Sequence, residues 1–291
     1  MEPINDLAIK ADELTKLSFD DDKYRLLEDA ILNVSPDEDE KIIFNNAELQ
    51  GVEAAMNNLL TRMRESYRQQ ARFVNDASHE LRTPIAVIEG YANMLSRWGK
   101  EDEKVLEESI NAIKTESGRM KALVEQLLFL ARGDSGKTII KREEIILNDL
   151  MNEIYEESLM IDEEHAYKFK NLNDFDVIKC VGDYGLLKQA VRILVDNATK
   201  YTAKGDEITL SVGREDASRI YLQVQDMGIG MDKEAIEHMF ERFYRADEAR
   251  SKDGTGLGLS IAKWIVDKHK GYFEITSRID LGTRIKIILP I

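Results

Sequence analysis

The sequence has almost no cysteine: Cys180 is the single one among 291 residues. One thiol excludes an internal disulfide framework and any zinc site built from several cysteines. Cys180 lies in the alternating run DVIKCVG, so we expect it at a buried strand position, without a reactive thiol.

Long apolar runs are also missing. No stretch approaches the roughly 20 apolar residues that a membrane-spanning helix needs, and we find no signal peptide. We therefore expect the chain as given to be soluble and to suit a reducing compartment.

Proline is scarce, with four residues, and charged residues make up 33% of the chain, which favours a helix-rich, well-solvated protein. The formal net charge of −15 argues against nucleic-acid binding, because phosphate contacts need clustered Lys and Arg. Hydrophobic residues, at 43%, suffice for real cores in one to three domains.

Residues 1–72 should form two helical stretches around an acidic connector that contains FDDD and SPDEDE. Pro3 suits a first helical turn. In the second stretch, a 3-4-3-4 apolar spacing favours a coiled-coil seam, with an ordinary amphipathic helix as the alternative. The seam positions are Leu49, Val52, Met56, Leu59 and Met63.

No Gly or Pro within 64–72 stops this helix, and the same spacing resumes from Val74 to Leu95. A second helix from Leu106 to Ala131 carries a seam with the same spacing, which includes Ile110 and Val124. With a turn at 98–100, this pattern predicts an antiparallel helical hairpin. Its apolar faces are too wide for one pair of helices, so dimerisation into a four-helix bundle would bury them.

His79 lies in the stretch FVNDASHELRTP at 73–84. It is two residues from both Ala77 and Leu81, or about 200° around a helix, so it should lie outside the seam and face solvent. Pro84 has no N–H to donate, so the helix should bend here. By itself, an exposed histidine is most often a surface side chain without a functional role.

From residue 143 the pattern changes to a mixture of helices and strands, which fits an α/β sandwich with helices on one face of a sheet. We expect helices at 147–159, 184–199 and 257–268, and strands at 167–172, 177–181, 207–213, 220–226, 273–277 and 284–289.

Three motifs stand in this last region. The helix at 184–199 ends in DNATKYT. The strand at 220–226 leads into DMGIG, whose glycines free the backbone to approach a ligand closely. GTGLGLS opens a helix whose N-terminus can bind phosphate. The residues concerned are Asn197, Lys200 and Tyr201, then Asp226, Gly228 and Gly230, then Gly254, Gly256 and Gly258.

Each motif alone is weak. GxGxG can be a Rossmann turn, but the polar ARSKDG and not a strand precedes it. It can be the glycine loop of a Ser/Thr-type kinase, but no strand with a partner lysine or HRD-like loop follows. Asn197 can be only a helix C-cap. The order Asn…DxGxG…GxGxG over about 60 residues is far more specific.

With these motifs, the C-terminal region resembles the ATP-binding domain of sensor histidine kinases, within the wider family that includes gyrase, Hsp90 and MutL. FERFYRAD at 240–247 resembles the aromatic-basic segment between their two glycine motifs, and GTRIKIILP resembles their final strand. SHELRTP at 78–84 resembles their phosphoacceptor box. Residues 1–65 resemble a HAMP signal-relay module, although the connector at 18–46 is longer than the family norm.

The resemblance implies an α+β multidomain fold: a helical HAMP module and a four-helix dimerisation bundle, followed by an α/β sandwich of the GHKL (Bergerat) type. The predicted boundaries are 1–65 for the HAMP-like module, 66–133 for the dimerisation and phosphoacceptor hairpin, 134–142 for a linker and 143–291 for the ATP-binding domain. HAMP normally follows a membrane helix, so the chain is expected to be the cytoplasmic portion of a membrane receptor.

The resemblance also implies that ATP phosphorylates His79, which then passes the phosphoryl group to an aspartate of a response regulator. Neutral imidazole keeps a lone pair on one ring nitrogen, and Glu80 can accept the proton of the other. In the family, a threonine at the place of Thr83 helps a water to dephosphorylate the regulator. Its hydroxyl can instead bond back to the carbonyl of His79.

Further roles follow from the resemblance for the nucleotide. Asp226 would accept a hydrogen bond from the adenine amino group, and Asn197 would bind Mg²⁺ through its side-chain oxygen. Lys200 and Arg245 would offset phosphate charge, Tyr201 would contact nucleotide or simply pack, and the loop at 246–253 would close over the ligand. The predicted catalytic residues are His79, Glu80 and Thr83, and the predicted ATP-binding residues are Asn197, Lys200, Tyr201, Asp226, Gly228, Gly230, Arg245, Gly254, Thr255, Gly256, Leu257 and Gly258.

Two other functions compete with this one. An ATP-driven clamp of the same nucleotide fold is disfavoured by the histidine box on a hairpin. A coiled-coil adapter with an inactive ATP domain is disfavoured by the intact Asn197, Asp226 and glycines. The expected partners are a second copy of the chain, bound through the hairpin, and the receiver domain of a response regulator. We expect no nucleic acid, and membrane contact only through a missing N-terminal region. Transfer within one subunit or across the dimer stays open at this point.

Overall fold

The structure is a computed structural model that describes residues 41–43, 49–99, 102–135, 138–171, 177–246 and 254–291. It divides into two compact units, residues 1–75 and 76–291. The first helix and most of the connector of the predicted HAMP-like module lie outside the described residues. No helix within the described ranges is long and apolar enough to cross a membrane.

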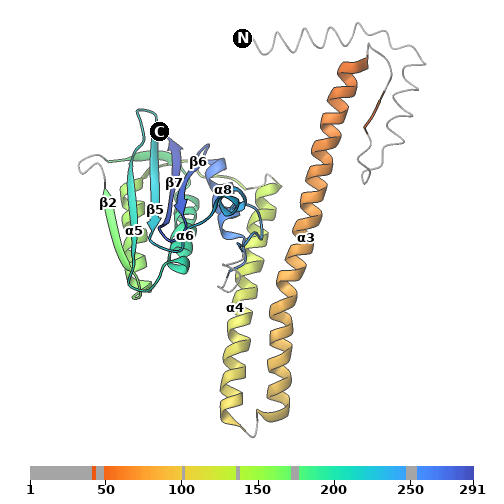
Figure 1. Cartoon of the computed structure of the whole chain (residues 1–291), viewed down its shortest axis with the longest axis vertical. Helices are drawn as coiled ribbons and strands as arrows, with labels where there is room; N and C mark the ends of the chain where they lie inside the picture. The colour runs from red at the N-terminus through yellow and green to blue at the C-terminus, as the bar shows by residue number, and fades with distance from the viewer. Residues whose placement is uncertain (1–40, 44–48, 100–101, 136–137, 172–176, 247–253) are drawn as a thin grey trace. The chain divides into compact units, whose positions relative to one another are not determined.

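Helix α3 runs without interruption from Gln50 to Trp98 (Figure 1). The prediction that the seam helix continues into the His79 stretch is thus confirmed. Pro84 lies inside this helix, which continues beyond it, and the predicted bend stays a prediction.

In the first unit, the segment 41–43 is attached to α3 through Asn57. The side chain of Asn57 accepts from the N–H of Ile42 and donates to its carbonyl, both at 2.9 Å. Ile42 and Leu49 are buried there, packed against Val52, Met56 and Leu60. The first part of the predicted seam is therefore used within the unit.

Helix α4 runs from Glu103 to Asp134 and begins with a strong cap. The Asp102 carboxylate accepts from the N–H groups of Lys104 and Val105 at 2.9 and 3.2 Å, which satisfies two of the free donors at the helix start. Figure 1 shows α4 turning back along the C-terminal half of α3, as predicted for a hairpin.

The rest of the chain forms an α/β domain around a five-stranded sheet in the order β2-β4-β5-β7-β6. β2 pairs with β4 in parallel, and the other neighbours pair antiparallel. The strands are β2 (Ala166–Asn171), β4 (Glu207–Arg214), β5 (Arg219–Asp226), β6 (Tyr272–Arg278) and β7 (Gly282–Pro290). The helices are α5 (Leu147–Ile161), α6 (Tyr184–Tyr201), α7 (Lys233–His238) and α8 (Gly258–Lys268).

Apolar residues alternate with polar or small ones along β4 and β5, which explains why the helices cover the apolar face. Leu210, Leu222 and Ile287 are buried side chains of one face, whereas Ser211 and Gln223 alternate with them on the other. Helices α5, α6 and α8 pack on the apolar face (Figure 1). The predicted sandwich is confirmed.

Two details differ from the sequence prediction. The strand expected at 177–181 does not join the main sheet: β3 (Lys179–Gly182) pairs with β1 (Glu143–Ile146) in a separate two-stranded sheet. The short α7 was not among the helices expected from the sequence. It is capped by Asp232, which accepts from the N–H of Ala235 at 2.7 Å.

Candidate functional site

A cavity of about 860 Å³ opens between α6, the segment after β5 and the start of α8. Ten of the twelve residues predicted to bind ATP line it. The two exceptions, Gly228 and Leu257, are buried and do not line it. The structure therefore brings together three motifs that lie far apart in the sequence.

Asp226 ends β5 and is held by two backbone groups. Its Oδ1 accepts from the N–H of Gly228 at 2.9 Å and from that of Thr283 at 3.1 Å. Burial raises the pKa of the Asp226 carboxyl, and these two N–H groups partly offset the rise. Since no described residue bonds to Oδ2, that oxygen is available to accept a hydrogen bond from a ligand in the cavity.

Asn197 lies in the last turns of α6, and its side chain lines the cavity. Among the described residues, none makes a hydrogen bond to its buried Nδ2 atom. A buried amide atom without a partner costs about 1–3 kcal/mol, so this arrangement suits a polar ligand that would satisfy it. An amide oxygen is also a ligand type that suits Mg²⁺, which means that Asn197 fits the predicted metal role.

Gly228 of DMGIG has a packing reason that the sequence did not reveal. A Cβ at Gly228 would lie 2.3 Å from the carbonyl oxygen of Tyr201, and the N–H of Ile229 donates to that same oxygen at 3.2 Å. These contacts fix the loop to the end of α6. Close approach of the loop to a ligand stays a prediction.

The start of α8 and the segment before it are joined to one another. Gly256 has a φ of +70°, and a Cβ there would lie 2.7 Å from the backbone of Phe243. The N–H of Phe243 donates to the carbonyl of Gly256 at 3.0 Å. The N-cap residue Leu257 provides no side-chain cap, so the first N–H groups of α8 are suited to an anion.

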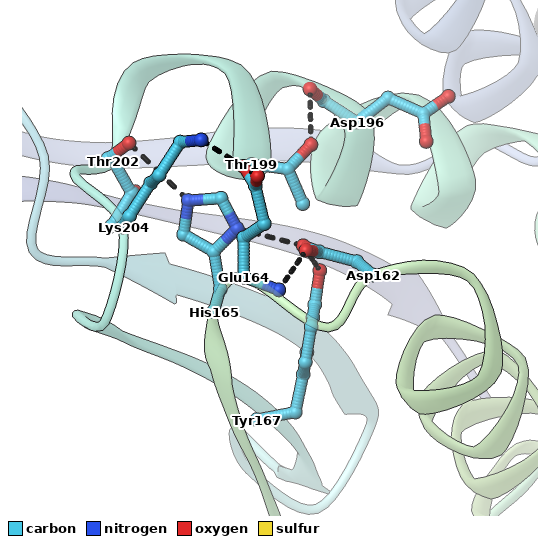
Figure 2. A network of polar contacts seen from close by, with 8 residues as sticks. All are labelled: Asp162, Glu164, His165, Tyr167, Asp196, Thr199, Thr202 and Lys204. Atoms are coloured by element: carbon cyan, nitrogen blue, oxygen red, sulfur yellow. Dashed lines mark hydrogen bonds and ion pairs between the residues drawn. The ribbon is translucent and has the colours of Figure 1, made fainter.

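A polar network supports the end of α6 from outside the cavity (Figure 2). The Asp162 carboxylate accepts from the hydroxyl of Tyr167 and from the His165 ring, both at 2.7 Å. The other ring nitrogen of His165 lies 3.3 Å from the carbonyl of Thr202. Burial opposes the Asp162 charge, but these hydrogen bonds and the N–H of Glu164 lower its pKa on balance.

The aromatic-basic segment at 240–247 borders the cavity. Tyr244 and Arg245 line the cavity. Phe240 packs on Phe273 of β6 with ring centroids 4.7 Å apart. The loop predicted to close over the ligand lies almost wholly outside the described residues, since 247–253 are not described.

His79 is exposed on α3 and borders a second cavity of about 280 Å³. That cavity is lined by Asp76, His79 and Glu80 on one side and by residues 241–244 on the other. No described hydrogen bond joins Glu80 to the His79 ring, and none joins the Thr83 hydroxyl to the carbonyl of His79. The exposure of His79 agrees with its predicted position outside the seam.

Sequence reasoning missed one residue of the larger cavity. Gln126 of α4 lines it, and its Oε1 accepts a hydrogen bond from the Thr255 hydroxyl at 2.7 Å. Nothing in the local pattern distinguishes Gln126 from other polar residues of an amphipathic helix.

Comparison with known families matches residues 69–136 to the His Kinase A (phospho-acceptor) domain, and residues 182–291 to the "Histidine kinase-, DNA gyrase B-, and HSP90-like ATPase". Sensor histidine kinase YkoH of Bacillus subtilis is 40% identical over 250 residues, which cover 83% of this chain and 52% of that protein. The chain belongs to the bacterial sensor histidine kinases. Its C-terminal domain therefore binds ATP.

Another relative of this histidine kinase is the signal transduction histidine-protein kinase ArlS of Staphylococcus aureus, 36% identical over 247 residues that cover 84% of the chain and 54% of ArlS. The chain thus spans about half the length of the curated relatives it matches. Among solved structures, histidine kinase ThkA in complex with response regulator protein TrrA has a TM-score of 0.61 at 23% identity, covering 78% of this chain and 63% of ThkA. At this identity the likeness shows the fold alone.

Proposed function

We propose that this histidine kinase phosphorylates its own His79 from Mg²⁺-ATP and passes the phosphoryl group to an aspartate of a response-regulator receiver domain. The observation that carries the proposal is the cavity in which ten predicted ATP-binding residues meet around the unsatisfied Asn197 amide. His79 supplies an exposed nucleophile in the same chain.

The roles of the residues follow from their positions. Oδ2 of Asp226 would accept a hydrogen bond from the adenine amino group, and the start of α8 would bind phosphate oxygens. Asn197 would hold the metal ion, which offsets charge on the phosphates when bound. Lys200 and Arg245 line the same cavity and would add positive charge.

In the proposed reaction, one ring nitrogen of His79 attacks the γ-phosphorus. The new N–P bond forms as the bond from that phosphorus to the bridging oxygen breaks, and ADP leaves. The proton on the other ring nitrogen passes to Glu80 or to solvent, since Glu80 borders the same cavity as His79.

Labelling with γ-³²P ATP and Mg²⁺ tests the function. We expect an acid-labile, alkali-stable label that His79→Ala abolishes and Asn197→Ala strongly reduces. Steady ATP hydrolysis without bound label would instead support the ATP-driven clamp. Absence of nucleotide binding would support the inactive adapter.

We also propose that the kinase forms a homodimer through the hairpin at 66–133 and dephosphorylates its regulator with help from Thr83. Thr83 is exposed, and within the described residues its hydroxyl is not engaged in a bond back to His79. Thr83→Ala should slow regulator dephosphorylation about 10-fold or more while autophosphorylation is unchanged. Release of phosphate from the labelled regulator measures this, and a wild-type rate would refute the role of Thr83.

A further inference from the structure

One face of α4 contacts the ATP-binding domain of the same chain at several points. Gln126 accepts from the Thr255 hydroxyl at 2.7 Å, and the Phe129 ring meets Trp264 of α8 edge-on with centroids 5.1 Å apart. Positions 126, 129 and 133 are three and four residues apart, so they lie on one helix face. Figure 1 shows α4 and α8 next to each other.

Gly133 and Asp134 complete this contact at the end of α4. Trp264 lies so close to Gly133 that an added Cβ would be 2.6 Å from its ring. Asp134 forms an ion pair with Arg242 at 2.8 Å. We call the set Gln126, Phe129, Gly133 and Asp134 the α4 docking face.

The docking face places the segment 241–244 against the histidine of its own chain. Arg242, which pairs with Asp134, also lines the cavity that contains His79. Tyr244 lines both that cavity and the nucleotide cavity. Tyr244 therefore borders both cavities within a single chain.

We propose that phosphoryl transfer to His79 takes place within one chain, with the α4 docking face holding the ATP-binding domain toward its own histidine. The inference rests on the proposed autophosphorylation and specifies which subunit supplies the nucleotide. Bonds and protons change as described for that reaction. In a homodimer, each subunit would then phosphorylate itself.

Mixed dimers test this directly. A wild-type chain is co-expressed with a size-tagged Asn197→Ala chain, and dimers that contain both are isolated and given labelled ATP. Only the wild-type chain has a complete nucleotide site, so transfer within one chain labels the wild-type chain and leaves the Asn197→Ala chain unlabelled.

Other distributions of the label would contradict the inference or the proposed function. Label on the Asn197→Ala chain alone would show transfer across the dimer and overturn the inference. Label on neither chain, while wild-type homodimers are labelled, would also overturn it, because the wild-type chain would need its partner's site. If wild-type homodimers take no label, the proposed function itself fails.

The docking face has its own test with a matched control on the same helix. Gly133→Ala forces Trp264 to move, whereas a Cβ at Gly118 meets nothing within 4 Å. Both changes replace a glycine of α4 with alanine. We expect Gly133→Ala to slow autophosphorylation about 10-fold or more, because small displacements of reacting groups are costly, without changing the affinity for an ATP analogue.

Gly118→Ala should leave the autophosphorylation rate at the wild-type value. Circular dichroism of both variants verifies that the helices are retained. A wild-type rate in Gly133→Ala would overturn the role of the docking face.

Discussion

The helical hairpin and the ATP-binding domain bury their apolar side chains to very different extents. Ile154 of α5 and Leu210 of β4 are both 0% exposed. On α4, Ile110 is 51% exposed and Val124 is 42% exposed, although both lie on the predicted seam. The ATP-binding domain buries its core side chains within one chain. The hairpin leaves apolar side chains exposed, and a second copy of the hairpin would bury them.

The difference teaches that the two regions depend on different conditions. The stability of the domain should be independent of protein concentration, because its packing is internal. The hairpin should gain stability as a second copy binds, so its stability is linked by mass action to the concentration of the chain.

The largest expected effect comes from a charge on the exposed seam. Ile110→Glu places one carboxylate from each chain at the predicted dimer interface. Burying a side chain of this size stabilises by about 1.5–3 kcal/mol, so losing two of them weakens dimerisation by roughly 100-fold or more.

Sedimentation equilibrium measures this change in the dimer dissociation constant. Ile161→Glu is the matched control, because Ile161 is 72% exposed but lies on α5 of the ATP-binding domain. Dimerisation that survives Ile110→Glu would remove the distinction between the two regions.

Truncating a buried side chain of the ATP-binding domain should lower its free energy of unfolding by a similar amount. This loss should not depend on protein concentration. Ile154→Ala should reduce the free energy of unfolding by about 2–5 kcal/mol, since the side chain is fully buried and leaves a cavity. Urea denaturation at two protein concentrations measures it. Leu159→Ala on the same helix is the control, because Leu159 is 46% exposed and should change stability little.

The polar support of α6 should contribute less than the core. Tyr167→Phe removes the hydroxyl that donates to Asp162 at 2.7 Å, and a hydrogen bond to a charged group contributes about 1.5–3 kcal/mol. The pKa of Asp162 is lowered in the folded state, so this stabilisation is present above the unfolded pKa and is lost as the pH falls through the folded one.

Urea denaturation of wild type and Tyr167→Phe over a range of acidic pH values checks this prediction. The two curves should converge at the lowest pH. A difference that grows toward acid would contradict the assigned direction.

The smallest expected effect is a pH dependence of nucleotide affinity, which should affect the ATP-binding domain and not the dimerisation of the hairpin. Burial raises the pKa of Asp226, so its carboxylate takes up a proton at a higher pH than an ordinary aspartate. A protonated carboxyl is a poorer acceptor, so nucleotide affinity should fall as the pH drops through this raised pKa, by up to about 10-fold per pH unit.

Titration of a fluorescent ATP analogue at successive pH values measures the decline, with the dimer dissociation constant followed in parallel. Asp226→Asn should remove the pH dependence in this range. An unchanged dependence in that variant would mean that another group is responsible.

Sequence reasoning succeeded where structure depends on neighbouring residues. The seam spacing predicted one continuous helix through His79, and the strand pattern DVIKCVG predicted the buried Cys180 of β3. The resemblance then grouped Asn197, Asp226 and five glycines, and all of these except Gly228 meet in one cavity.

Contacts between distant segments were not predictable in this way. Thr255 and Gln126 are 129 residues apart, and Arg242 and Asp134 are 108 apart. Side chains of these types occur on any solvated helix, so no local pattern indicates the partner. The pairing of β3 with β1 was missed for the same reason, and α7 is too short for a helical period to show.

The single thiol of the chain has a practical consequence. Cys180 is buried in β3, and burial raises its pKa to about 11, so very little thiolate is present near neutral pH. The folded chain should therefore react slowly with maleimides. One cysteine introduced on an exposed part of α4 would then carry a fluorophore at a single known position, and movement of the ATP-binding domain along the hairpin could be followed in solution without removing any native residue.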